Sequence, residues 1–320
     1  MENTTRLLRR HDERLRGRAV VVAEADDAAL TGLPAASLLL CSDDSTLPGR
    51  QADWLPRGPV TADLLVVIMP KSRERLRLVL TCLAGQISGP TPVWLVGISQ
   101  GGVRGGATEL AACCDNVVLE DSARHCKLYS GLLRPAPFVL DEHQRRWQHD
   151  GLTVVSYPGV FSHGRLDDGT ALLLEWLAGQ TLSGRALDLG CGAGILSAWL
   201  ARAGLEVSAV DISATAVAAT QATLAANLLH ARVSAGDLYA AVTGRFDLIV
   251  SNPPFHDGLA RTTATTERLI REAPAHLKEG GRLVLVANQG LPYEARLRQA
   301  FRHLEVAAEN RHFRVWLARR

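Results

Sequence analysis

The chain has 320 residues, of which 47% are hydrophobic and 21% charged, and a formal net charge of +2. Its length favours two domains, and its composition is that of a globular protein. No apolar run is long enough to predict a membrane-spanning segment, and the first residues lack the apolar core of a signal peptide. We therefore expect a cytoplasmic protein with no membrane partner. Neither half is strongly basic, so charge alone does not indicate nucleic-acid binding.

The cysteines form no Cys-x-x-Cys pair and have no histidines at metal-ligand spacing. We therefore expect neither a disulfide framework nor a metal site, and we interpret these residues as small buried hydrophobic side chains. They are Cys41, Cys82, Cys113, Cys114, Cys126 and Cys191.

The front half of the chain predicts strands and one helix. Short apolar runs place strands at 19–23, 37–41, 63–68 and 93–97, and a longer periodic segment predicts a helix over 72–84. The rear half alternates more clearly between strands at 185–189, 205–211, 231–235, 246–251 and 281–287 and helices at 195–203, 213–228, 266–277 and 294–301. This alternation predicts an α/β fold with a doubly wound parallel sheet. Two last strands, near 305–308 and 312–318, predict an antiparallel hairpin at its edge.

Two segments of the front half align with two of the rear half. Residues 63–70 (DLLVVIMP) align with residues 247–254 (DLIVSNPP), and 95–101 (LVGISQG) parallels 285–290 (LVANQG). We interpret this as a duplicated domain, although any two buried strands share some likeness. We predict a front domain of residues 1–148 and a rear domain of residues 149–320, joined near 144–151.

A glycine-rich loop with two acids predicts a cofactor site in the rear domain. Gly190, Gly192 and Gly194 follow a strand and open a helix, while Asp188 precedes them and Asp211 ends the next strand. A dinucleotide site has the same outline, but its spacing is G-x-G-x-x-G. The G-x-G-x-G spacing and the acid before the first glycine favour S-adenosylmethionine, whose amino group and sulfonium suit a carboxylate.

Asp237 follows the third strand, where an acid can accept a hydrogen bond from the adenine amino group. An ordinary turn aspartate explains it equally well.

The segment Ser251-Asn252-Pro253-Pro254-Phe255-His256 ends the fourth strand and predicts the chemistry. Exocyclic amines are poor nucleophiles because the nitrogen lone pair is delocalised into the ring. The amide oxygen of Asn252 and the carbonyl of Pro253 can each accept one N–H and so aim that lone pair at a methyl donor. The two prolines stiffen the segment, and Phe255 can stack on a base. His256 either touches the substrate or lies on a loop.

Four segments of the rear half, together with these motifs, resemble the RsmC family of 16S ribosomal RNA (guanine-N2)-methyltransferases. They are residues 158–174 (PGVFSHGRLDDGTALLL), 187–197 (LDLGCGAGILS), 251–257 (SNPPFHD) and 286–293 (VANQGLPY).

The resemblance implies two tandem Rossmann-like class I methyltransferase domains, of which the front one is degenerate and serves structure or RNA binding. The front domain has Glu24 where the glycine loop would begin, and Ile68 and Met69 where Asn252 and Pro253 stand. The rear domain would bind S-adenosyl-L-methionine and transfer its methyl group to a guanine N2. The expected partner is 16S rRNA or the 30S subunit, and we expect a monomer.

Further residues have two interpretations each. Phe161 can cover the cofactor, or its segment only leads to a helix capped by Asp167 or Asp168. Lys71 and Arg73, with Arg75 and Arg77, form either a phosphate-binding strip or a solvated helix face. The amino-terminal arginines 6, 9, 10 and 14 share this ambiguity.

Other functions fit some of the motifs. A sibling enzyme that methylates guanine N2 in 23S rRNA would share all of them. A glutamine methyltransferase acting on release factors usually has Tyr in place of Phe255 and a helical front domain. A non-catalytic RNA-binding protein would not need the intact cofactor and Asn-Pro-Pro motifs.

Overall fold

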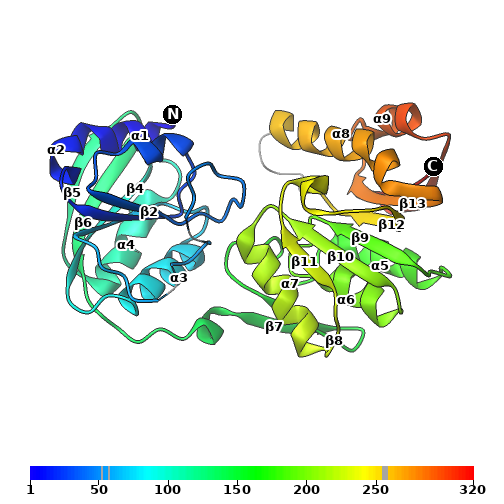
Figure 1. The fold of residues 1–320 in the computed structure, drawn as a ribbon, viewed down its shortest axis with the longest axis horizontal. Helices are drawn as coiled ribbons and strands as arrows, with labels where there is room; N and C mark the ends of the chain where they lie inside the picture. The colour runs from blue at the N-terminus through cyan, green and yellow to red at the C-terminus, as the bar shows by residue number, and fades with distance from the viewer. Residues whose placement is uncertain (52, 57, 254–258) are drawn as a thin grey trace. The chain divides into compact units, whose positions relative to one another are not determined.

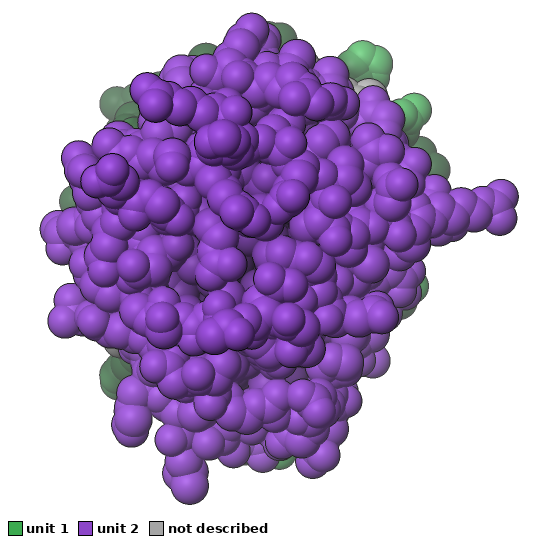
Figure 2. Space-filling view, turned by 90° about the vertical axis from the view of Figure 1, so that its right-hand side faces the viewer, with its two compact units in different colours: residues 1–144 green, residues 145–320 purple. Residues whose placement is uncertain are grey.

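The computed structural model describes residues 1–51, 53–56, 58–253 and 259–320, with side chains of 259–263 left aside. The chain divides into two compact units, Met1–Gln144 (unit 1) and Arg145–Arg320 (unit 2). Figure 1 shows both units as ribbons. Figure 2 is a space-filling view in which unit 1 is green and unit 2 is purple. Within the described residues, no helix is both long and apolar enough to cross a membrane.

Unit 2 is built on a seven-stranded sheet in the order β11-β10-β9-β12-β13-β15-β14. Its strands are β9 (Arg185–Leu189), β10 (Glu206–Asp211), β11 (Arg232–Ala235), β12 (Phe246–Ser251), β13 (Leu277–Asn288), β14 (His303–Glu309) and β15 (Phe313–Arg319). The first five pair in parallel, whereas β15 runs antiparallel to both β13 and β14. The predicted doubly wound sheet with an antiparallel edge hairpin is therefore confirmed.

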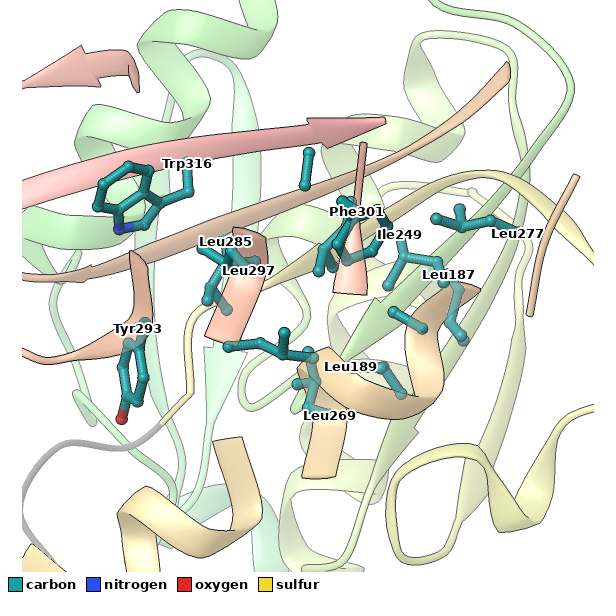
Figure 3. Packing of buried hydrophobic residues seen from close by; sticks show 14 of the residues in the cluster. Leu187, Leu189, Ile249, Leu269, Leu277, Leu285, Tyr293, Leu297, Phe301 and Trp316 are labelled. Atoms are coloured by element: carbon teal, nitrogen blue, oxygen red, sulfur yellow. The ribbon is translucent and has the colours of Figure 1, made fainter. Parts of the chain in front are cut away.

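Helices cover both faces of this sheet. They are α5 (Asp168–Ala178), α6 (Ile195–Arg202), α7 (Ala214–Ala226), α8 (Leu259–His276) and α9 (Tyr293–Ala300). Leu269 of α8, Leu297 of α9 and Phe301, which follows α9, are buried against Leu187 and Ile249, as Figure 3 shows from close by. Helices α5 and α6 bury their leucines on the opposite face.

The two-residue period of a strand decides which side chains face which helices. Leu187 and Ile249 pack under α8 and α9, whereas Leu248 and Val250 pack under α5 and α6. By the same alternation Asp188 of β9 and Asn252, just past β12, belong to the face covered by α5 and α6. The hydrogen bonds described below agree with this assignment.

Unit 2 begins with a hairpin that the sequence analysis treated as a joint. Strands β7 (Arg145–His149) and β8 (Leu152–Ser156) pair antiparallel across Asp150 and Gly151, which have φ of 46° and 72°. Two positive φ values at the central residues are typical of a type I′ hairpin turn. The hairpin is fixed to α7 because the Thr223 hydroxyl accepts from the Val155 amide at 2.9 Å.

Unit 1 is built on a six-stranded sheet in the order β2-β1-β3-β4-β6-β5. Its strands are β1 (Ala19–Ala23), β2 (Ser37–Leu40), β3 (Leu64–Ile68), β4 (Thr91–Ile98), β5 (Cys114–Ala123) and β6 (Cys126–Leu133). Its α-helices are α1 (Asn3–Leu8), α2 (Asp12–Leu15), α3 (Arg73–Ala84) and α4 (Val103–Cys113). The predicted strands and the helix over 72–84 are present, while β5, β6 and α4 were not predicted.

The two sheets share one topology, with β2-β1-β3-β4-β6-β5 corresponding to β10-β9-β12-β13-β15-β14. A matching hydrogen bond marks the same place in each. The Asp63 carboxylate accepts from the first amide of β1, at Ala19, at 2.8 Å, and the Asp247 carboxylate accepts from the first amide of β9, at Arg185, at 2.7 Å. These two aspartates are paired in the sequence alignment, so the structure supports a duplication.

Candidate active site

The candidate site lies where three adjacent strands of unit 2 end. Asp188 of β9 is in register with Ala209 of β10 on one side and Val250 of β12 on the other. Since all three strands are parallel, their carboxyl ends meet at one edge of the sheet. The glycine loop after β9, Asp211 at the end of β10 and Asn252 after β12 are thereby brought together.

The glycine loop adopts a backbone that other residues rarely take. Gly190, Gly192 and Gly194 have φ of 76°, 54° and 79°. At Gly194, which begins α6, an added Cβ would also stand 2.7 Å from the Thr220 Cα. The positive φ therefore favours glycine at all three positions, and close packing excludes a side chain at the third.

Asp211 holds this loop in place. One carboxylate oxygen accepts from the Gly192 amide at 3.0 Å and the other accepts from the Ser213 amide at 2.9 Å. These two hydrogen bonds fix the carboxylate at the end of β10, next to the glycine loop. Ile212, the next residue, keeps 42% of its surface exposed and presents an apolar side chain beside this acid.

Asp188 is fully buried beneath the loop. Its Oδ2 accepts a 2.6 Å hydrogen bond from the Ser197 hydroxyl of α6, while its Oδ1 has no hydrogen-bond partner within the described chain. Burial raises the pKa of Asp188 to about 7, against the opposing effect of the Ser197 hydrogen bond. A buried acceptor of this kind suits a cationic ligand, which would replace the lost hydration of the carboxylate.

Asp237 has a partner that the sequence analysis did not foresee. Arg268 of α8 forms an ion pair with its carboxylate, and both side chains are about one-third exposed. The pair connects the turn after β11 to the helix that follows the Asn-Pro motif. Phe161 lies on the loop before α5 with 45% of its surface exposed.

Asn252 is held by the first turn of α5. Its Nδ2 donates to the Asp167 carboxylate and to the Thr170 hydroxyl, both at 2.8 Å. Its Oδ1 is buried and has no hydrogen-bond partner among the residues described. The arrangement leaves one amide oxygen available to accept an N–H from a ligand.

The Asn-Pro motif is tied to the glycine loop through its first residue. The Ser251 hydroxyl donates to the main-chain carbonyl of Leu189, the residue before Gly190, at 2.7 Å. Pro253 is buried. Pro254, Phe255 and His256, which the sequence also assigned to this site, lie outside the described residues.

The basic residues of unit 1 divide into exposed and buried ones. Lys71 and Arg73, predicted to contact RNA, are exposed near the start of α3. Arg75, proposed as part of the same strip, is 3% exposed and bonds to Glu24 at 2.7 Å, so its inclusion was wrong. Its position on the inner face of α3 explains the error. Arg77 is engaged with Glu109 at 3.0 Å.

Three of the four amino-terminal arginines, Arg9, Arg10 and Arg14, have acidic partners within unit 1. Arg10 contacts Asp121 and Arg14 contacts Glu120, each at 2.9 Å. These ion pairs favour the interpretation of this segment as a solvated helical face.

Glu24 occupies, after β1, the position that Gly190 occupies after β9. It keeps the positive φ, at 57°, although it carries a side chain. Its carboxylate, on a side chain that is 12% exposed, is engaged by Arg75, whose guanidinium also lies 4.7 Å from the Trp54 ring centroid. The loop of unit 1 is thus built around an internal ion pair instead of glycines.

The described part of the chain contains no group of three or more His, Cys, Asp or Glu side chains that could hold a metal ion. All six cysteines are free thiols, and five of them are buried.

Several residues of the site were not predicted from the sequence. Asp167 was considered only as a helix cap, a role that is confirmed because its carboxylate accepts from the Thr170 amide at 2.9 Å. Its contact with Asn252, like that of Thr170, joins residues more than 80 positions apart in the chain, whereas Ser197 contacts Asp188, nine positions before it. A spacing pattern along one sequence contains no signal for such contacts.

The fold and the site together define a class of enzyme. A glycine loop after one strand, an acid ending its neighbour and an Asn-Pro motif after the other neighbour, on a sheet with a reversed edge strand, define a class I methyltransferase. Two family models agree, since residues 151–317 match the methyltransferase small domain and residues 5–147 match the methyltransferase small domain N-terminal.

Similar proteins narrow the class to one family. Ribosomal RNA small subunit methyltransferase C of Alcanivorax borkumensis is 49% identical over 325 residues, covering 99% of each chain. The protein of the same name from Pseudomonas entomophila is 39% identical over 334 residues, covering 100% of each chain. The chain therefore belongs to the ribosomal RNA small subunit methyltransferase C family, as its sequence predicted.

A solved structure agrees over nearly the whole chain. It is the T. thermophilus 16S rRNA N2 G1207 methyltransferase (RsmC), in complex with AdoMet and guanosine, with 26% identity and a TM-score of 0.80. The match covers 94% of the present chain and 88% of that one. The prediction of two tandem methyltransferase domains is thereby confirmed.

Proposed function

We propose that the protein transfers a methyl group from S-adenosyl-L-methionine to the exocyclic N2 of a guanine in 16S rRNA. The observation that carries the proposal is the buried Asn252 Oδ1, an acceptor without a partner in the described chain, beside the glycine loop. The names of the family members and of the solved relative, which was studied with AdoMet and guanosine, support the same substrates.

The residues around the loop fit the proposed cofactor. The Asp211 carboxylate, already held by two amides, would accept from ribose hydroxyls. Ile212 offers an apolar surface to an adenine ring, and Asp237 would accept from its amino group. The buried Asp188 Oδ1 would favour the cationic part of the ligand. Phe161, exposed before α5, would cover the cofactor.

Catalysis by this chain would consist mainly of positioning. When bound, S-adenosylmethionine supplies an electrophilic methyl group. Asn252 Oδ1 and the Pro253 carbonyl would each accept one N–H of the guanine amine and fix the direction of its lone pair. Good alignment of two reactants can recover about 7–11 kcal/mol of an activation barrier. A general base is not required, because the amine becomes acidic once it is methylated.

The proposal also covers how the RNA substrate is bound and what each domain does. The target guanine would leave its stack at a cost of a few kcal/mol. We propose the rear domain, residues 149–320, as the catalytic one and the front domain, residues 1–148, as a structural or RNA-binding support. Lys71 and Arg73 are its candidate phosphate contacts. We further propose that the protein acts as a cytoplasmic monomer on 16S rRNA or the 30S subunit.

Mapping of methylated nucleosides tests this proposal. Purified protein and labelled S-adenosylmethionine would be incubated separately with unmodified 16S rRNA, 23S rRNA and 30S subunits, and the RNA digested for mass spectrometry. We expect N2-methylguanosine at one position of 16S rRNA. Label in 23S rRNA alone would support the sibling activity, and label in no RNA would contradict the proposal.

A further inference from the structure

We propose that Asp167 and Thr170 are positioning residues that fix the amide of Asn252 in the orientation required for transfer. This inference rests on the proposed function, in which Asn252 Oδ1 accepts an N–H from the target amine. Neither residue needs to touch the substrate or the cofactor, because both act through Asn252.

Both hydrogens of the Asn252 amide are used within the protein. One is donated to Asp167 Oδ2 and the other to Thr170 Oγ1, and each distance is 2.8 Å. An asparagine amide has two N–H donors and one carbonyl acceptor, so this side chain keeps only its acceptor for a ligand. That acceptor is the buried Oδ1.

The two partners also decide which end of the amide faces them. A carboxylate oxygen only accepts hydrogen bonds, so Asp167 favours the nitrogen of Asn252 and repels its oxygen. The Thr170 hydroxyl lies 3.3 Å from Asp167 Oδ2 and donates to it, which leaves its lone pairs for Asn252. An amide rotated by half a turn would bring its oxygen against Asp167 Oδ2, and the Thr170 hydroxyl could donate to that oxygen only by giving up its own bond to Asp167.

The positions of the partners are themselves fixed by α5. Asp167 Oδ2 also accepts from the Thr170 amide at 2.9 Å and so caps the helix. Thr170 is 7% exposed, and the next turns bury Leu173, Leu174 and Leu177 in the core that contains Val250. The helix therefore places both acceptors rigidly against the end of β12.

A fixed acceptor has a consequence for specificity. An amine donates hydrogen bonds, whereas a ring carbonyl such as guanine O6 only accepts them. With its nitrogen held by Asp167 and Thr170, Asn252 can bind the amine and repels a carbonyl at the same place. A freely rotating asparagine could bind either group and would orient the amine only part of the time.

The most selective test is a pair of substitutions at Thr170. Thr170→Val keeps the branched shape and removes the hydroxyl, while Thr170→Ser keeps the hydroxyl. We expect Thr170→Val to lower kcat on 16S rRNA by about 10- to 100-fold, the range in which small misplacements act. The KM for RNA and the Kd for cofactor should change less than about twofold, and Thr170→Ser should restore most of kcat.

A second pair separates Asn252 positioning from helix capping. Asp167→Ser retains a good N-cap but is too short to keep the contact with Asn252. Asp168→Ser removes the neighbouring exposed charge of the same helical turn and serves as the control. We expect similar melting temperatures for both variants and a fall in kcat, again of about 10-fold or more, only for Asp167→Ser.

The outcomes distinguish this inference from the proposed function. Wild-type kcat in Thr170→Val, or an equal loss in Thr170→Ser, would overturn the inference. A fall in kcat for Asp168→Ser as large as for Asp167→Ser would do the same. If the wild type methylated another RNA, the proposed substrate would be wrong, and the same variants compared on that RNA would decide the roles of Asp167 and Thr170.

Discussion

Ser251 and Leu189 join the two motifs of the site, because the buried Ser251 hydroxyl donates a 2.7 Å hydrogen bond to the Leu189 carbonyl. The residue that follows Ser251 is the proposed substrate acceptor, and the residue that follows Leu189 begins the glycine loop. Substrate and cofactor residues thus extend from one point of the sheet, and substitutions on either side should separate chemistry from cofactor binding.

Asn252→Ala should abolish methyl transfer and leave cofactor binding nearly unchanged. The substitution removes an acceptor for the amine, whereas Asp188 and Asp211, the proposed cofactor residues, lie on β9 and β10. Transfer would be measured with labelled S-adenosylmethionine and 16S rRNA, and binding by calorimetry. Transfer at the wild-type rate by this variant would contradict the mechanism.

Asp211→Ala should weaken cofactor binding. The substitution removes the acceptor for the Gly192 and Ser213 amides as well as the proposed ribose contact. Hydrogen bonds to charged groups contribute about 1.5–3 kcal/mol, which corresponds to a Kd about 10- to 100-fold higher. Calorimetric titration of the wild type, Asp211→Ala and Asn252→Ala would test this, and equal affinity in all three would refute it.

Cofactor affinity should rise with pH through the titration of Asp188, whose pKa burial raises from 3.8 to about 7. A cationic ligand binds best to the ionised carboxylate, so the Kd should fall between pH 6 and pH 8 and level off above that. Asp188→Asn should be weaker and lack this dependence. Calorimetry at several pH values provides the measurement, and a flat wild-type profile would argue against the cationic contact.

The same pKa shift has a defined effect on folding. The folded protein holds the Asp188 proton more tightly than the unfolded chain does. The contribution of Asp188 to stability is therefore greatest below about pH 4 and decreases as pH rises through about 7.

Asp237→Ala should weaken cofactor binding, whereas Arg268→Ala should not. The Asp237–Arg268 ion pair is partly exposed, and such pairs contribute about 0–1 kcal/mol to stability. Loss of the arginine leaves the carboxylate free to accept from adenine, while loss of the acid removes that acceptor. Parallel Kd measurements on the two variants decide between an adenine contact and a purely structural pair. An equal effect of both would favour the structural role.

Arg75→Leu should destabilise unit 1 much more than Arg77→Leu. Arg75 is 3% exposed and its loss leaves the Glu24 carboxylate buried without its cation, a change that typically costs about 3–5 kcal/mol. Arg77 is 57% exposed, and exposed pairs contribute about 0–1 kcal/mol. Chemical unfolding of both variants would show the difference, and similar midpoints would refute a structural role for the buried pair.

Much of the rear domain could be predicted because its motifs are local. The helix predicted over 213–228 is α7, and its start is capped by Ser213, whose hydroxyl accepts from the Ala216 amide at 3.1 Å. The apolar runs of β9 and β12 mark buried strands whatever their neighbours are. The glycine loop and Asp211, the acid that ends β10, lie within one strand–helix–strand unit, so spacing alone could place them.

The remaining features had a weak or misinterpreted local signal or depend on contacts between distant residues. Helix α8 was predicted to begin at residue 266 but begins at Leu259. Its first turns contain threonines, whose weak helix propensity concealed this start in the sequence. The hairpin of β7 and β8 has a typical Asp-Gly turn that was interpreted as a linker. The contact of Asn252 with Asp167 spans 85 positions, and the pairing of Asp237 with Arg268 spans 31.

A crystal structure of the protein with S-adenosylhomocysteine and guanosine tests the central claim most directly. We expect the guanine N2 within about 2.7–3.2 Å of Asn252 Oδ1, with Nδ2 still bonded to Asp167 and Thr170. A guanine bound with N2 away from Asn252, or an Asn252 whose nitrogen faces the base, would contradict the account.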